Sequence, residues 1–111
     1  MMRFSRFPIA RFKVHGHSME PTIKNGSYIL VNKWATPKVG NIIAFEHIGK
    51  VMIKRISKIQ NRKYFVEGDN KKDSLKVGSI KKEQIIGKAV FKIPYLGWVK
   101  IWAVDFIKTF I

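Results

Sequence analysis

The stretch Ser18-Met19-Glu20-Pro21-Thr22 lies between Gly16-His17 and an Asn25-Gly26 turn, and it organises the interpretation of the chain. Residues 9–14 alternate loosely and include Phe and β-branched side chains, which predicts a strand that ends at Gly16. On the other side Pro21 restricts the backbone, and the segment before it is too short for a stable helix. The pattern predicts a serine exposed on a turn. A Ser/Thr turn or a helix N-cap explains the same residues without chemistry.

A serine hydroxyl is a weak nucleophile until a base takes its proton, so a catalytic Ser18 needs a second residue. The chain has no cysteine, which excludes thiol catalysis and cysteine-ligated metal sites. It also lacks a glycine-rich nucleotide loop and a metal-ligand cluster, so neither cofactor nor metal is expected. His15 and His17 lie too close to Ser18 to face it from an extended chain, and His47 falls in a predicted turn.

Lys54 is the lysine whose surroundings suit a base. Residues 51–59 are predicted to form a strand, and its period of two places Met52, Lys54 and Ile56 on one face. Desolvation among apolar side chains disfavours the ammonium form, which leaves an amine able to accept a proton. Because 17 of the 111 residues are lysines, a protective charge on an edge strand is the alternative interpretation.

Five short motifs, in this order, resemble the signal peptidase I family of serine proteases. They are Ser18-Met19-x-Pro21-Thr22, Gly26 with 28–33, 40–45, Lys54-Arg55-Ile56 and Gly68-Asp69-Asn70, within roughly residues 14–92. The resemblance implies that Ser18 is the nucleophile and Lys54 the general base, a dyad that replaces the usual triad. The residues alone indicate the same pair.

The chain departs from the family pattern in two places. After the Gly-Asp-Asn box, bacterial members continue with a serine and then Asp-Ser-Arg, whereas this chain has Ser74 followed by Lys76-Val77-Gly78. The acidic–basic structural pair is therefore missing or supplied elsewhere, with Asp73 as the nearest substitute. Gly16 stands where some members have a serine that binds the oxyanion, so backbone N–H groups of Ser18 and His17 are expected to bind it.

Further residues are assigned to the surroundings of this dyad. The substrate is expected to be an extended peptide laid against a strand edge, with shallow pockets at the cleavage site walled by Val14, Met19 and Ile23. A preference for small side chains there is implied by the resemblance alone. Structural roles are predicted for Pro21, Arg55, Asp69, Asn70 and Ser74, with Asp69 and Asn70 organising the loop behind the dyad.

A chain of 111 residues is one domain by size, without room for the large inserted domain of bigger signal peptidases. Turn signals separate runs of β-branched and aromatic residues, at Asn25-Gly26, 37–40, Ile48-Gly49, 61–63, 68–70 and Val77-Gly78. This spacing predicts a mostly β fold, a small barrel or coiled antiparallel sheet, over residues 1–95. The resemblance implies the same architecture.

Residues 96–111 are predicted to form an amphipathic C-terminal helix. Its apolar face includes Trp98, Trp102, Phe106 and Phe110, and its polar face includes Lys100 and Lys108. With a net charge of +15, this pattern predicts peripheral binding to an anionic membrane surface. The three charges in this tail disfavour a span, and a core helix packed on the sheet is the alternative.

Two further observations concern location and partners. Arg3, Arg6 and Arg11 interrupt the apolar runs near the N-terminus, so no anchor is expected there. Residues 93–98 resemble the archaeal and endoplasmic-reticulum branch of the family, which normally has histidine in the place of Lys54. No recognition helix or aromatic stacking motif accompanies the positive charge, so specific nucleic-acid binding is not expected.

The sequence therefore predicts a membrane-associated serine endopeptidase that cleaves signal peptides or similar precursor segments after small residues. Its catalytic domain is expected on the extracytoplasmic face, with a cytoplasmic location as the alternative. Three other functions stay open: a cytosolic maturation protease like the short enzymes that trim nickel superoxide dismutase precursors, a self-cleaving repressor domain, and an inactive peptide-binding module. The lack of an N-terminal span favours the cytosolic maturation protease. The shared Ser-Lys dyad favours the self-cleaving repressor domain, and the altered segment after Asn70 favours the inactive peptide-binding module.

Overall fold

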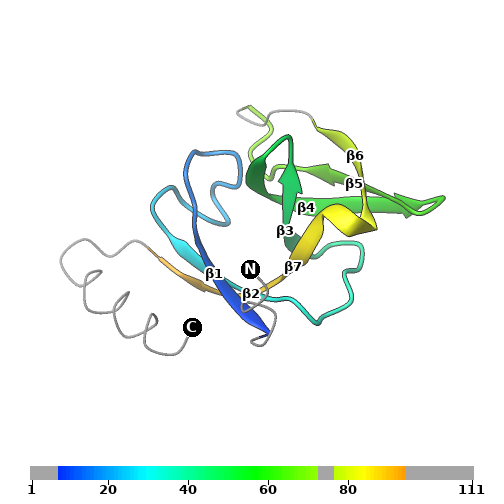
Figure 1. Ribbon diagram of the computed structural model, residues 1–111. Coiled ribbons are helices and arrows are strands. Elements are labelled where there is room, and N and C mark those ends of the chain that lie inside the picture. The colour runs from blue at the N-terminus through cyan, green and yellow to red at the C-terminus, as the bar shows by residue number, and fades with distance from the viewer. Residues whose placement is uncertain (1–7, 73–76, 95–111) are drawn as a thin grey trace.

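A computed structural model of the chain describes residues 8–72 and 77–94, which form one coiled antiparallel sheet (Figure 1). Within these residues the strands lie in the order β1-β2-β7-β3-β4-β5-β6. Their bounds are β1 (Ile9–Lys13), β2 (Tyr28–Asn32), β3 (Ile42–His47), β4 (Lys50–Gln60), β5 (Lys63–Glu67), β6 (Gly78–Lys81) and β7 (Ile85–Ile93), with a 3₁₀ turn η2 (Lys82–Gln84) before β7. The predicted mostly β fold is confirmed, and the predicted helix at 96–111 lies outside the described residues.

The hairpin of β3 and β4 sets the register of Lys54. Its turn is Ile48-Gly49, and both residues have a positive φ, 51° and 74°, as the tightest hairpin turns require. The register then pairs Phe45 with Met52 and Ile43 with Lys54. Because side chains alternate along a strand, Lys54 shares its face with Met52 and Ile56, as the period of two predicted.

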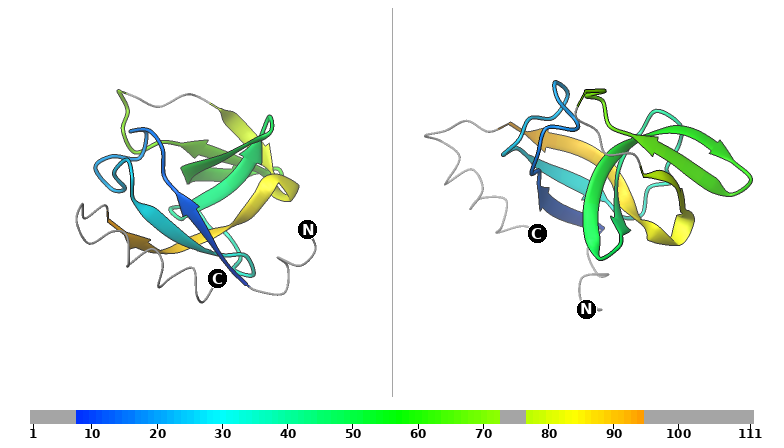
Figure 2. Two further views of the ribbon diagram at one scale, coloured as in Figure 1. Left: turned by 60° about the vertical axis from the view of Figure 1, so that its left-hand side comes forward. Right: turned by 90° about the horizontal axis from the view of Figure 1, so that it is seen from above.

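Strand β4 is long enough to pair with two strands, one along each half of its length. Its first half, Lys50–Arg55, pairs with β3, and its second half, Arg55–Gln60, pairs with β5. A register shift between Ile56 and Lys58 bends the strand where the partner changes. Figure 2 shows the result: the sheet coils strongly, so that strands far apart in its order approach one another.

Two clusters of buried apolar side chains lie inside the coiled sheet. The first contains Val14, Met19, Ile23, Ile29, Val31 and Ala44, and the second contains Ile43, Phe45, Ile56, Val66 and Ile80. Met19 and Ile23 come from the loop after β1, so that loop contributes to the core instead of lying on it. The loop that carries Ser18 is thereby fixed by hydrophobic burial, the dominant favourable term in folding.

Gly87, in β7, lies so close to β2 that there is no room for a side chain. A Cβ atom there would lie 2.6 Å from the Asn32 backbone oxygen and 2.7 Å from Val31 Cγ1. We expect Gly87→Ala to lower the free energy of unfolding by about 1–3 kcal/mol, because β2 would have to move away. Urea denaturation measures the loss. Val90→Ala, at an exposed position of the same strand, is the control, and equal stability of the two variants would contradict the close packing.

Candidate active site

Ser18 lies in the loop that connects β1 to β2, and this loop is closed at its base. The Val14 N–H donates to Ser27 O at 2.8 Å, which continues the pairing of the two strands. Gly16 has a φ of 99°, a value that favours glycine, and its N–H donates to Asn25 Oδ1 at 2.7 Å. Ser18 stays partly exposed within this closed loop.

A contact between His17 and Glu20 spans the segment that contains Ser18. His17 Nδ1 and Glu20 Oε2 lie 2.9 Å apart, and the Glu20 N–H donates to His17 O at 3.1 Å. The hydrogen bond with His17 is the main cause that lowers the pKa of Glu20, and the Asn25 N–H is a second. The Glu20 carboxylate therefore stabilises the turn on which Ser18 lies.

The Asp69 carboxylate joins the Ser18 loop to β4. Asp69 Oδ2 accepts hydrogen bonds from Thr22 Oγ1 at 2.6 Å and from Arg55 Nη2 at 2.8 Å. Asp69 Oδ1 accepts another from Arg55 Nε at 2.9 Å, and Arg55 Nη1 donates to Gly40 O at 2.8 Å. The bonds from Arg55, and then the one from Thr22, hold the pKa of Asp69 below its usual value of 3.8. Arg55 directly follows Lys54 in β4, so this cluster connects the segments that carry Ser18 and Lys54.

This pair of Arg55 and Asp69 supplies the acidic–basic contact whose position the sequence left open. Asp73, the substitute nearest in sequence, lies outside the described residues, as does Ser74. Thr22 belongs to the Ser18 motif, but no role was assigned to it from the sequence. Its contact could not be read from spacing, because Thr22 and Asp69 are brought together only by the coiling of the sheet.

Asn70 binds the backbone directly around Ser18. Its N–H donates to Ser18 O at 2.8 Å, and its side-chain Nδ2 donates to His17 O at 3.0 Å. Two backbone carbonyls of the turn are satisfied by one residue of the Gly-Asp-Asn box. Asp69 and Asn70 thus lie behind the Ser18 turn, one bound to its side chains and the other to its backbone.

Ser18 and Lys54 line the same hollow, which has a volume of about 360 Å³. One wall is formed by the end of β1 and the loop after it, and the other by the first half of β4. The lining residues are Lys13, Val14, His15, Ser18, Met19 and 50–54. Lys54 is 2% exposed, so it is the buried basic residue of this hollow, whereas Ser18 is reached from solvent.

The other residues predicted for the site differ in where the structure places them. Val14 and Met19 line the hollow, and the Ser18 and His17 N–H groups belong to the loop on its wall. Ile23 is 2% exposed in the core and is not among the lining residues, because its N–H bonds to Met19 O and the chain turns inward there. Pro21 is exposed in the loop. The tail residues Trp98, Trp102, Phe106 and Phe110 lie outside the described residues.

The structure adds two basic residues that the sequence analysis did not select. Lys50 and Lys13 both line the hollow, and both are exposed. The period of two in β4 places Lys50 on the same face as Met52 and Lys54. Lys50 was nevertheless not predicted for the site, because the strand was expected to begin one residue later, at 51. Of the histidines, His15 lines the hollow, whereas His47, at the end of β3, does not.

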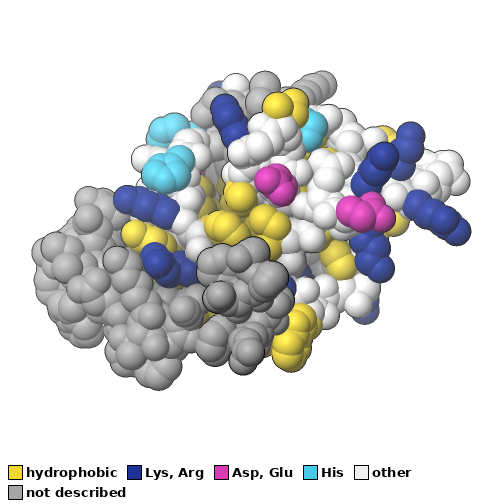
Figure 3. Space-filling model, viewed as in Figure 1, with side chains coloured by type: hydrophobic (Ala, Val, Ile, Leu, Met, Phe, Trp, Pro, Cys, Tyr) yellow, Lys and Arg dark blue, Asp and Glu magenta, His cyan; other side chains and the backbone are white. Residues whose placement is uncertain are grey.

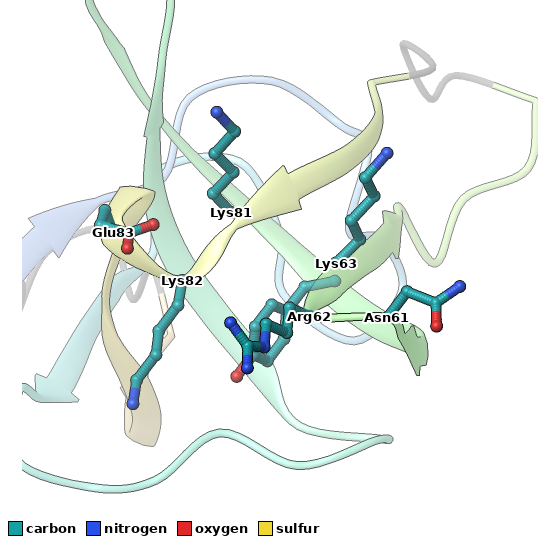
Figure 4. Close-up of a pocket in the computed structure, with 7 residues that line it drawn as sticks. Asn61, Arg62, Lys63, Lys81, Lys82 and Glu83 are labelled. Carbon is teal, nitrogen blue, oxygen red and sulfur yellow. The ribbon is translucent and has the colours of Figure 1, made fainter.

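A larger hollow of about 510 Å³ lies beside the β4–β5 turn (Figure 4). Its lining consists of Asn61, Arg62, Lys63, Tyr64, Lys81, Lys82 and Glu83, none of them predicted for the site. Lys63 and Lys81 extend to one side of it and Lys82 to the other, so the cations do not converge (Figure 4). With no nucleophile and no buried base in its lining, this hollow is not the candidate active site.

The Asp69 cluster makes folding stability depend on pH in a defined direction. Because the folded pKa of Asp69 is lowered, the unfolded chain binds more protons as pH falls below 3.8. Stability from this group is present above that pH and is lost as pH falls through the lower, folded pKa. We expect Asp69→Asn to cost about 1–2 kcal/mol at pH 7, since both partners are partly solvated, and the cost to shrink in acid.

Urea denaturation of both proteins between pH 7 and pH 2.5 measures this difference. Glu67→Gln is the matched control, because Glu67 pairs with Lys71 at 3.8 Å on the exposed surface. We expect this variant to follow the wild-type protein throughout. If the free energy of unfolding of Asp69→Asn differed from that of the wild-type protein by the same amount over the whole pH range, the charge of Asp69 would not be the cause of the lost stability.

Comparison with known families gives one match. The family model described as Peptidase S24-like matches residues 7–90, which include β1, the Ser18 loop, Lys54 and the Asp69 cluster. No curated protein matches the chain. The peptidase description supports the serine-protease class that Ser18 and Lys54 indicate, whereas signal peptidase I as the particular family stays a prediction. Since the match extends over most of the chain, the protein belongs to the Peptidase S24-like family.

Proposed function

We propose that the protein is a serine peptidase in which Ser18 is the nucleophile and Lys54 the general base. The observation that carries this proposal is that a partly exposed serine and a lysine only 2% exposed line one hollow. Membership of the Peptidase S24-like family supports the same chemistry. The carboxylates near the loop are bound, Glu20 to His17 and Asp69 to Arg55, and His15, which also lines the hollow, is exposed.

In this mechanism Ser18 Oγ attacks the carbonyl carbon of the substrate while Lys54 Nζ takes the Ser18 proton. The oxyanion that forms is bound by backbone N–H groups, for which Ser18 and His17 are proposed. Lys54 then gives its proton to the leaving amine as the peptide bond breaks. A water molecule attacks the acyl-enzyme, again with Lys54 as the base, and restores Ser18.

Two strand edges beside the hollow suit an extended substrate. Among the described strands β1 pairs with β2 alone, so its other edge is open. The first half of β4 pairs with β3 on one side, while β5 joins the other side only from Arg55 onward. A peptide laid along these edges would form backbone hydrogen bonds and pass over Ser18. Val14 and Met19 then wall the positions next to the scissile bond, where a small side chain is proposed.

The sequence supports a more specific proposal for the substrate and for the location in the cell than the peptidase class alone. Signal peptides or similar precursor segments are the proposed substrates, with peripheral membrane binding through residues 96–111. No helix within the described part of the chain is long and apolar enough to cross a membrane.

Self-cleavage is the second candidate, and the family match favours it because self-cleaving domains use the same dyad. Mass spectrometry of the purified chain during incubation separates the two: self-cleavage shortens it, and cleavage of added peptides leaves it intact.

Ser18→Ala and Lys54→Met should each abolish cleavage, because either change leaves no activated nucleophile. The loss should be at least about 10³-fold in kcat/KM, and the double variant should lose no more than either single one. Methionine fills the space of the buried lysine, so Lys54→Met should stay folded. The assay is mass-spectrometric detection of products from a mixed peptide library.

Lys58→Met is the control for the loss of a lysine, since Lys58 lies in the same strand but is exposed. It should cleave the library as the wild-type protein does. Circular dichroism checks that each variant is folded. A folded Lys54→Met protein with near wild-type activity would refute the proposed base.

The rate should also rise with pH, because only the neutral amine of Lys54 can take the Ser18 proton. A histidine base would instead produce a rising limb near pH 6.5, its reference value. The histidines to test are His15, which lines the hollow, and His17, next to Ser18. The kcat/KM profiles of His15→Ala and His17→Ala should keep the rising limb of the wild-type protein. Disappearance of the limb in either variant would assign the base to that histidine.

A further inference from the structure

The charged and titratable side chains that line the Ser18 hollow are all basic. The lining contains Lys13, Lys50, Lys54 and His15, and no aspartate or glutamate. The carboxylates of the Ser18 loop and of the loop behind it are bound, Glu20 by His17 and Asp69 by Arg55. On the face drawn in Figure 3, Lys and Arg side chains are more prominent than acidic ones. A substrate that enters this hollow therefore meets a positive field from Lys13 and Lys50.

Lys50 is the cation best placed to act on a substrate. It is exposed, and no ion pair holds it within residues 8–72 and 77–94. The alternation of β4 places it on the face that carries Met52 and Lys54. The carboxylate nearest to it along β3, Glu46, lies on the opposite face, since it follows the inward-facing Phe45. His47, the register partner of Lys50, adds no negative charge.

Lys13, on the other wall, is a weaker candidate. Its ammonium lies 5.9 Å from the centre of the Tyr28 ring, and the Arg11 guanidinium lies 5.6 Å from the same ring. Both cations thus lie near one aromatic ring on β2. Lys13 contributes to the field of the hollow, whereas the ammonium of Lys50 is available to bind a substrate carboxylate directly.

Resting on the proposed peptidase function, we propose that Lys50 selects substrates with an aspartate or glutamate about four residues from the scissile bond. Lys50 precedes Lys54 by four positions, and a strand rises about 3.3 Å per residue, so the two lie about 13 Å apart along β4. A substrate strand laid along β4 has the same rise. Its residue facing Lys50 is therefore about four positions from the residue facing Lys54.

The test uses one cleavable peptide found in the library and a matched panel built on it. Glu or Gln is placed at each position from the second to the sixth on both sides of the scissile bond. The measured quantity is the ratio of kcat/KM for the Glu peptide to that for the Gln peptide. For the wild-type protein we expect a ratio of about two to five at one position, the range for an exposed ion pair. Higher salt should lower it, because screening weakens solvent-exposed charge pairs.

Lys50→Glu should bring the ratio below one at that position, and Lys50→Gln should bring it near one. Lys82→Glu is the matched control, since it makes the same change of charge at an exposed residue of the other hollow. It should keep the wild-type ratio. A wild-type ratio of one at every position, or a preference that survives in both folded Lys50 variants, overturns the proposal.

Binding measurements separate this proposal from the peptidase function. Ser18→Ala protein should bind the Glu peptide two to five times more tightly than the Gln peptide, as measured by fluorescence anisotropy. If the wild-type protein cleaves no peptide of the library, the same Glu and Gln panel is built on a library peptide that binds the Ser18→Ala protein. Selective binding that depends on Lys50 would then support the acidic preference and reject the peptidase. Cleavage without a charge preference would support the peptidase function and reject the acidic preference.

Discussion

The contacts of the Asp69 carboxylate are the constraint on which the candidate site depends. This one side chain accepts hydrogen bonds from Thr22 in the Ser18 loop and from Arg55 in β4, at 2.6 to 2.9 Å. The Asp69 side chain is only 16% exposed, and hydrogen bonds to a charged group shielded from water are stronger than those between neutral groups. Since Arg55 adjoins Lys54, the position of Ser18 relative to Lys54 is set through this carboxylate.

The candidate site also requires the coiling of the sheet. Strands β2, β7 and β3 separate β1 from β4 in the sheet order, yet residues of β1 and β4 line one hollow. Register shifts in the β2–β7, β3–β7 and β4–β5 pairs accompany this curvature, since a bulge bends a strand and increases its twist. The hollow therefore has a loop on one wall and the free half of a strand on the other, which suits an extended peptide.

Much of this arrangement was predictable from local patterns. The alternation around Lys54 indicated which face of β4 it occupies, and the glycine and proline residues around Ser18 indicated a turn. The partner of Arg55 was not predictable, because spacing in the sequence offered Asp73 as the acidic residue, whereas the fold brings Asp69 to Arg55. The burial of Ile23 was missed for a related reason: a loop residue looks available for a pocket until the chain is seen to turn it into the core.

The sequence by itself therefore determined the β class, the serine on its turn and the lysine on an apolar face. These follow from backbone restrictions and from the period of two, both of which act over a few residues. Only the tertiary structure decided that Ser18 and Lys54 line one hollow, that Asp69 pairs with Arg55, and that Lys50 stands unpaired by any described carboxylate at its mouth. Those contacts join segments far apart in the chain, and they exist only once the sheet has coiled.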